Sequence, residues 1–580
     1  MYYPIYGGTI MGSIIKKKKG KQTYYYWVES ARVNGQPRIV SQKYLGRGEA
    51  IVQAIEGKKG LDTPKHSIVQ EFGHVMALYD LASRLGVIEL IDSVAPKRDQ
   101  GLSIGQYMLL AAINRAVDPK SKNKIAEWYE KTALHQVIPA QSQMLSSQRF
   151  WDHMHLLSEK AILRFEDTFT QQIVEKYDLS TECLIYDTTN FFTYIDTNTT
   201  SALAKRGDSK EKRTDLKIVG LSMMVSPDFN IPLFHETYPG NDQDVKTFSK
   251  TIEQLKQRYL KITGAAKPVT LVFDKGNNSS ENIQLLRSGE QPFRIVSSLR
   301  LNQVSDLLHI PKEKYTPLLG KLEEQVTLYR TRYHVYDDEF TVLVVYNPAL
   351  LQGQLQGIQD NIDKCSLQLK DLQHTLYERE VGRITKGRKP TMDSVQKRVD
   401  TLLQKEFMKD LFITTVTKTT KSVQVHFSVS LAAYHELQKE RLGKTILFTD
   451  NHEWTSEKIV TAYRSQYHIE HTFRQMKNTD HLGMRPLHHW TDQKIKVHAF
   501  YCVLALRLCG LLQKELHQQG IELSVNRMLD LLSDIKQVIT VYPKEGESKK
   551  DRQVFSLSKP APEVKKIMEV LNIAQYQTRK

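Results

Sequence analysis

The spacing of apolar and polar residues changes character along the chain. Residues 24–45 hold two β-rich runs around Asn34-Gly35, a strong hairpin signal. Residues 67–178 then place apolar side chains three or four positions apart, as in helices. From residue 183 onward, short apolar runs are separated by polar turns, which is typical of strands. The pattern predicts a hairpin, then a helical region, then a mixed α/β region.

The mixed region shows three strand patterns followed by alternating helices and strands. In chain order these are strands 183–189, 216–226 and 231–239, helix 244–260, strand 268–274, helix 279–288 and strand 292–299. The first and fourth strands are almost continuously apolar, which suits the buried middle of a sheet. We therefore expect the order β-β-β-α-β-α-β.

Residues 300–445 interrupt this region. They contain strand-like stretches and a polar helical pair near 354–380 and 391–409, joined by a basic segment. This predicts an insertion with a small β-sheet of its own and a helical hairpin. Strand character returns at 446–450, and a helix is expected over 456–477.

The longest apolar run, 497–512, contains His498 and Arg507. Because it falls short of the roughly 20 residues that a membrane span needs, a buried helix is predicted.

Charge and cysteine content narrow the function classes. Lys and Arg outnumber Asp and Glu by 81 to 65, giving a net charge of +16. This excess favours a polyanion, nucleic acid before anionic membrane, although a basic soluble protein without such a partner also fits. The four cysteines form no C-x-x-C pair, which argues against a zinc site or a disulfide framework and fits a cytoplasmic location. The first residues place apolar side chains before lysines, the reverse of a secretory signal.

Two acids stand where apolar strands end. Asp187 and Asp274 close the first and fourth predicted strands, and ligands gather at the carboxyl ends of strands in open α/β sheets. If these strands are parallel neighbours, both carboxylates point into one crevice, where they repel unless a cation lies between them. Oxygen ligands without Cys or His favour Mg²⁺ or Mn²⁺ over zinc. A third carboxylate would complete a two-metal site for phosphoryl displacement.

The helix expected over 456–477 can supply that carboxylate. At 100° per residue, one stripe about 60° wide consists of Tyr463, Gln466, Glu470 and Lys477. A separate apolar stripe beside it consists of Ile469, Phe473 and Met476. Packing through the apolar stripe aims Glu470 at the metals and Lys477 at a DNA phosphate. The ordinary alternatives are a turn or cap role for each Asp and a solvated or ion-paired Glu.

At these residues the chain resembles the DDE transposases of bacterial insertion sequences. The resemblance is to the branch whose last acid lies in a Y-x₂-R-x₃-E-x₆-K signature, which is read here as Tyr463, Gln466, Glu470 and Lys477. Gln466 departs from the signature, because it stands in the arginine position. Further resemblance lies in the segments IYDTTNFF, RTDLKIVGLSMMVS, IPLFHETYPGNDQD and LVFDKGNNS.

The resemblance implies an α/β fold with a ribonuclease H-like mixed sheet flanked by helices. A largely β insertion with a helical hairpin would interrupt it, and a β-hairpin and a helical DNA-binding region would precede it. The expected parts are an N-terminal hairpin region (1–66), a helical DNA-binding region (67–180), the catalytic core (181–300 and 446–520), the insertion (301–445) and a C-terminal region (521–580).

The resemblance also implies a function. Asp187, Asp274 and Glu470 would hold two Mg²⁺ ions, with Mn²⁺ as a substitute. The partners would be double-stranded DNA, both terminal inverted repeats and target, and a second copy of the chain in a synaptic complex, with no membrane. Expected DNA contacts are Tyr463, Gln466, Lys477, Arg474, Lys275 and Arg485. Rival interpretations are a nuclease of the same fold that does not join DNA, an inactive transposase-derived DNA-binding protein, and a basic structural protein without metal.

Overall fold

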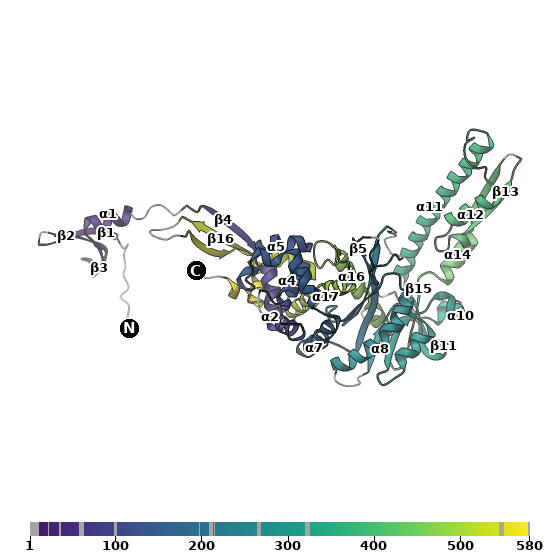
Figure 1. Cartoon of the computed structure of the whole chain (residues 1–580), viewed down its shortest axis with the longest axis horizontal. Coiled ribbons are helices and arrows are strands. Elements are labelled where there is room, and N and C mark those ends of the chain that lie inside the picture. The colour runs from purple at the N-terminus through teal and green to yellow at the C-terminus, as the bar shows by residue number, and fades with distance from the viewer. Residues whose placement is uncertain are drawn as a thin grey trace.

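The computed structural model arranges the chain as a series of parts from the N-terminal sheet to a distal arm (Figure 1). It describes residues 11–20, 22–33, 36–56, 63–97, 101–196, 198–207, 213, 215–263, 268–318, 325–420, 422–543 and 550–577.

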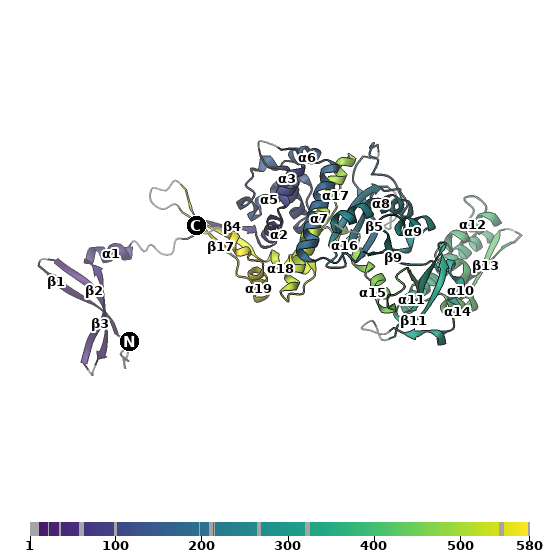
Figure 2. The same ribbon diagram turned by 90° about the horizontal axis from the view of Figure 1, so that it is seen from below.

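An antiparallel sheet of three strands forms the first part, with β2 in the middle. Its elements are β1 (Met11–Lys19), β2 (Gln22–Val33), β3 (Gln36–Gly46) and the helix α1 (Gly48–Glu56). The predicted hairpin is confirmed as β2 and β3, whereas its Asn34-Gly35 turn lies outside the described residues. Both views show this sheet apart from the helical region (Figures 1 and 2).

The helical region follows. Its helices are α2 (Gly73–Arg84), α3 (Val87–Val94), α4 (Ile104–Val117), α5 (Lys122–Glu130), η1 (Ala133–Gln136), η2 (Ser142–Leu145), α6 (Ser147–Leu156) and α7 (Glu159–Tyr177). The helical pattern predicted from residue 67 was wrong over its first turn. Residues 67–71 belong to the strand β4 (His66–Glu71), which pairs with β16 (Lys536–Tyr542) near the other end of the chain. Pairing with so distant a strand overrides the local periodicity.

C-terminal elements close this region. They are α18 (Val525–Ser533), β16, β17 (Arg552–Leu557), α19 (Pro562–Val570) and η6 (Ile573–Tyr576). Strands β17, β16 and β4 form a three-stranded sheet in that order.

The helix α17 (Asp492–Gln518) is the central core helix, and it packs against α2, α4 and α7. By length and composition alone it could cross a membrane, yet 94% of its most apolar window is buried inside the molecule. The prediction of a buried helix at 497–512 is therefore confirmed.

A nine-stranded mixed sheet carries the candidate site. Its order is β10-β11-β12-β15-β9-β8-β5-β6-β7. The elements predicted in the mixed region are confirmed as β5 (Cys183–Thr193), β6 (Lys217–Val225), β7 (Pro232–Pro239), α8 (Asp244–Thr263), β8 (Val269–Val272), α9 (Ser280–Arg287) and β9 (Phe293–Ser298). A short helix that was not predicted, η3 (Lys275–Asn277), follows β8. Strand β5 pairs with β8 in parallel, and β8 with β9 in parallel, so the first and fourth predicted strands are neighbours in the middle of the sheet.

Residues 301–443 differ from the expectation of a separate sheet. They begin with η4 (Leu301–Gln303), α10 (Ser305–Leu308), η5 (Lys312–Lys314), β10 (Thr316–Pro317), β11 (Thr327–Val335) and β12 (Asp338–Tyr346). These strands extend the main sheet, because β12 pairs with β15 (Lys444–Thr449).

The rest of that segment forms an arm with its own hydrophobic core. The arm consists of α11 (Pro348–Glu380), α12 (Met392–Leu402), α13 (Met408–Leu411), β13 (Phe412–Lys418), β14 (Val423–Val429) and α14 (Leu431–Glu440). Its β13–β14 hairpin is separate from the main sheet, and the predicted helical pair is present as α11 and α12. Figure 1 shows the arm at the end of the molecule opposite the N-terminal sheet.

Candidate active site

Two of the predicted acids occupy equivalent positions on neighbouring strands. In the parallel ladder of β5 and β8, Ile185 lies opposite Val272. Asp187 and Asp274 each lie two residues further along, at the edge where β8 ends. Since adjacent strands are about 4.8 Å apart and residues in register share a face, the two acids meet at one edge of the sheet. The sequence-based condition for their meeting, that these strands are parallel neighbours, is therefore fulfilled.

The surroundings of the acids differ. Asp187 is half-buried, and its Oδ1 accepts a hydrogen bond of 2.7 Å from the backbone N–H of Thr188. Asp274 is exposed and precedes η3, and its side chain makes no capping bond to that short helix. Glu470 is also exposed. Two of the three carboxylates are therefore exposed to solvent and one is half-buried.

The segment that carries Glu470 is two helices rather than the single predicted one. α15 (Ser456–Arg464) ends at Ser465, and α16 (Gln466–Lys477) begins directly after it. Tyr463 and Glu470 therefore lie on different helices, which corrects the stripe calculated for one continuous helix. The apolar stripe is confirmed, because Ile469, Phe473 and Met476 are at most 5% exposed. With that stripe buried, α16 packs against β5.

Tyr463 connects α15 to the edge of the sheet that holds the acids. Its hydroxyl donates a hydrogen bond of 2.8 Å to Oγ of Ser298, the last residue of β9. Burial, opposed by the bond to Ser298 and aided by the negative charges of Asp274 and Glu470, raises the pKa of Tyr463 to about 12. Asp274 and Glu470 thus both place negative charge near this hydroxyl.

Lys477 also lies beside this edge. Its ammonium group is 5.9 Å from the centre of the Phe191 ring, on the strand that carries Asp187. Arg474 is exposed on the same helix. Gln466 is half-buried, and its amide nitrogen is buried without a hydrogen-bond partner among the described residues. A donor left unpaired in this way is costly in the protein alone.

The remaining predicted contacts lie on two sides of the site. Lys275 is exposed directly after Asp274. Arg485 is half-buried, with its guanidinium 4.9 Å from the centre of the Phe192 ring, near the end of β5. Of the six predicted contact residues, three lie on α16, Tyr463 lies on α15, Lys275 begins η3, and Arg485 lies between α16 and α17.

A basic cavity of about 770 Å³ adjoins the acids, between the main sheet and the arm. One side of its wall includes Tyr463, Ser298 and Lys275, and α11 of the arm contributes Gln354. Besides Lys275, its cationic residues are Arg300, Arg441 and Lys444. Local sequence patterns carry no signal for these three residues, because the pairing of β15 with β9 brings them together.

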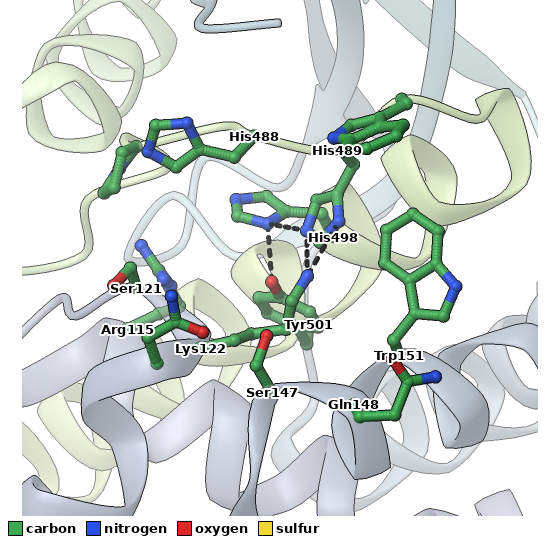
Figure 3. A pocket seen from close by; sticks show the side chains of 13 residues that line it. Arg115, Ser121, Lys122, Ser147, Gln148, Trp151, His488, His489, His498 and Tyr501 are labelled. Atoms are coloured by element: carbon green, nitrogen blue, oxygen red, sulfur yellow. Dashed lines mark hydrogen bonds between the residues drawn. The ribbon is translucent and has the colours of Figure 1, made fainter.

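A second cavity, of about 670 Å³, lies away from the acids, between α5, α6 and the segment before α17. Figure 3 shows Trp151 and His488 at its walls and a hydrogen-bonded chain from Lys122 through His489 and His498 to Tyr501. None of the three predicted acids lines it. His489 is 3% exposed, so it serves this polar network.

The donor set fits a hard divalent cation, since it offers carboxylate oxygens and no sulfur. Within the residues that the structure describes, however, no three His, Cys, Asp or Glu side chains are gathered closely enough to hold a metal ion. The pair of aspartates shares one edge of the sheet, and Glu470 is exposed on the helix that packs against β5.

A mixed α/β sheet with two carboxylates in equivalent positions on neighbouring parallel strands, near a cation-lined cavity, is an arrangement suited to phosphoryl transfer on a polyanion. The chain belongs to the family of the transposase DDE domain, whose family model matches residues 182–508. Among solved structures, a piggyBac transposase synaptic complex with hairpin DNA aligns over 79% of this chain and 78% of that chain, with 10% identity and a TM-score of 0.34. So weak a likeness carries no argument here. The comparison with curated proteins gives no match.

Proposed function

We propose that the chain is a cut-and-paste transposase that binds the terminal inverted repeats of its element and catalyses Mg²⁺-dependent DNA cleavage and strand transfer. Asp187, Asp274 and Glu470 are its catalytic carboxylates. The observation that carries the proposal is the parallel register of β5 and β8, which brings Asp187 and Asp274 to one edge of the sheet, with the helix of Glu470 packed on β5.

The strand order supports the assignment of a ribonuclease H-like core. Three antiparallel strands (β7, β6 and β5) are followed across the sheet by two parallel ones (β8 and β9). This is the arrangement expected of that core from the resemblance noted above. Residues 301–443 then stand as an insertion between β9 and β15, in the branch with the Y-R-E-K signature.

The chain's own groups have separate roles in the proposed reaction. Two divalent cations, when bound, supply the charge that activates water or a DNA 3′-OH and stabilises the leaving oxygen. The backbone N–H of Thr188 orients the Asp187 carboxylate. Tyr463 is a hydrogen-bond donor, and its pKa, raised to about 12, keeps it protonated well into the alkaline range. Lys477 is placed to pair with a phosphate of the DNA strand that is cut.

The basic cavity between sheet and arm supports a path for DNA next to the acids. Four cationic side chains at its wall attract phosphates, in line with the net charge of +16. By resemblance to the family, we propose a homodimer around paired DNA ends in the bacterial cytoplasm.

Asp187→Asn tests the catalytic assignment. The amide of Asn has nearly the same shape as the carboxylate but lacks the charge that binds a metal ion. Mg²⁺-dependent cleavage of a duplex carrying the element's end should therefore fall by more than about 100-fold. Binding of the same duplex, measured by fluorescence anisotropy, should change by less than about threefold.

The matched control is Asp371→Asn, at an exposed aspartate on α11 in the arm, which should leave cleavage unchanged. Cleavage by Asp187→Asn at the wild-type rate would refute the assignment. Cleavage by the wild type without joining to target DNA would identify a nuclease instead.

A further inference from the structure

The N-terminal sheet is a small, strongly basic unit. Its described residues include three acids, Glu29, Glu49 and Glu56, against eight basic residues, Lys16, Lys17, Lys18, Lys19, Arg32, Arg38, Lys43 and Arg47. With Lys21, which lies outside the described residues, residues 11–56 carry nine basic residues against three acids, a net charge of +6. The Lys16–Lys19 run lies in β1, and all four of its side chains are exposed.

Tyrosines gather on one face of this sheet. Tyr26 lies 5.2 Å from Tyr44, and Tyr24 lies 6.0 Å from Tyr44, measured between ring centres. Since side chains alternate between the faces of a strand, the even-numbered residues of β2 share this face. We call it the tyrosine face, and it consists of Tyr24, Tyr26 and Tyr44 with the basic residues around them.

Cations flank the tyrosine rings. The Lys17 ammonium is 5.0 Å from the Tyr26 ring centre, and the Arg47 guanidinium is 5.7 Å from that of Tyr24. Their hydrogen-bond partners are neutral amides: Lys17 donates to Gln42 at 2.9 Å, and Arg47 donates to Gln22 at 2.6 Å. Lys19, two residues from Lys17 in β1, lies on the same face. The positive charges of this face are thus oriented but not neutralised by these bonds.

The dimensions of the sheet suit a DNA groove. Three strands place their axes about 10 Å apart from edge to edge, and the major groove of B-DNA is about 12 Å wide. Tyr44 is 55% exposed, so its hydroxyl is free to reach base edges or phosphates. A surface where aromatic rings alternate with Lys and Arg is also typical of nucleic-acid binding, because the cations attract phosphates and the hydroxyl groups form hydrogen bonds.

We propose that the N-terminal sheet is a duplex-DNA-binding module that docks through its tyrosine face. Lys17, Lys19 and Arg47 contact phosphates, and the tyrosines contact the groove between them. The inference rests on the proposed transposase function, because it requires DNA as the partner of the chain. It adds a second DNA contact, away from the proposed catalytic acids, in a part of the chain outside the DDE domain match at 182–508.

The faces of β1 provide a matched test. Lys17→Gln/Lys19→Gln and Lys16→Gln/Lys18→Gln remove the same two charges from the same strand, but from opposite faces. Each full-length variant is titrated against a fluorescein-labelled duplex carrying the element's end, over a range of salt concentrations. Lys17→Gln/Lys19→Gln should weaken binding about tenfold near 0.15 M salt and reduce the slope of log affinity against log salt by about 2.

Lys16→Gln/Lys18→Gln should change the affinity by less than about threefold. Equal weakening by both pairs would show a diffuse charge effect and overturn the assignment of the tyrosine face, as would wild-type binding by Lys17→Gln/Lys19→Gln. These outcomes leave the catalytic proposal intact, because cleavage at saturating enzyme and its loss in Asp187→Asn are measured separately. A wild-type chain that binds no duplex would overturn both.

Discussion

At the scale of single residues, buried histidines give the molecule a sensitivity to acid. His489 and His498 are at most 3% exposed and lie 3.1 Å apart between ring nitrogens. Burial lowers the pKa of each well below its usual value, and nearby positive charges, including those of Arg115 and Lys122, lower it further. The folded protein therefore keeps both imidazoles neutral.

We predict that stability falls as the pH drops below about 6.5. The unfolded chain then binds protons that the folded chain excludes, so a lowered pKa yields stability that is present above the unfolded value and lost below it. His498→Asn should reduce the loss of unfolding free energy between pH 6.5 and 5 by up to about 1.4 kcal/mol per pH unit.

Chemical denaturation at each pH measures the slope of unfolding free energy against pH. The missing hydrogen bonds of His498 lower the stability of the variant at every pH and do not affect this slope. The control is His426→Asn, at an exposed histidine on β14, and its pH profile should match the wild type. An unchanged slope in His498→Asn would contradict the prediction.

Among the acids proposed as catalytic, the two aspartates were the most predictable residues, and their neighbours were the least. Asp187 and Asp274 each follow a short apolar run that marks them in the sequence. Asp274 lies just past the end of β8, whereas β5 continues six residues beyond Asp187, so the prediction that Asp187 closes its strand was wrong. Ser298, which accepts the hydrogen bond of Tyr463, lies 165 positions away from it in the chain. No pattern within either segment encodes that contact, because it depends on how β9 and α15 pack.

At the scale of elements, apolar periodicity predicted the existence of the Glu470 helix but not its break. The spacing of Ile459, Ile469 and Phe473 suits helix on both sides of Ser465. The hydroxyl of Ser465 bonds instead to the carbonyl of Ala462 at 2.6 Å, a local bond that competes with helix continuation. Likewise, the strand character of β11 and β12 was recognisable, whereas the sheet that they join was not.

We predict that the buried stripe of α16, rather than its exposed side, holds Glu470 in place. Ile469→Ala removes a side chain with 0% exposure and should lower the free energy of unfolding by about 2–5 kcal/mol. Tyr467→Ala, on the same helix at 62% exposure, should change it by less than about 0.5 kcal/mol. Urea denaturation compares the two, and similar losses in both would contradict the packing described.

At the scale of the whole molecule, segments from both ends of the chain close the helical region. β4 pairs with β16, and the N–H of Gly73 donates to the carbonyl of Ile535 at 2.8 Å. A Cβ at Gly73 would lie 2.1 Å from the carbonyl oxygen of Leu532, so only glycine permits this approach. Such long-range closure was not predictable, since neither segment carries a local signal for the other.

We predict opposite effects of the same substitution at two glycines. Gly73→Ala should lower the melting temperature, because the added methyl group forces the two segments apart at a cost of about 1–3 kcal/mol. Gly353→Ala, inside α11 with no atom within 4 Å of the new Cβ, should raise helix stability by up to about 1 kcal/mol. Differential scanning calorimetry of both variants checks the signs, and a rise for Gly73→Ala would disprove the close contact.

The same closure sets an order of events during synthesis on the ribosome. Helices α2 and α4 pack against α17, whose residues are translated almost 400 positions after α4. Until α17 emerges, the apolar sides of these early helices lack their main neighbour and stay open to aggregation or chaperones. An interrupted translation product that stops before residue 492 should therefore accumulate as insoluble material, so only a chain read nearly to its end becomes a working protein.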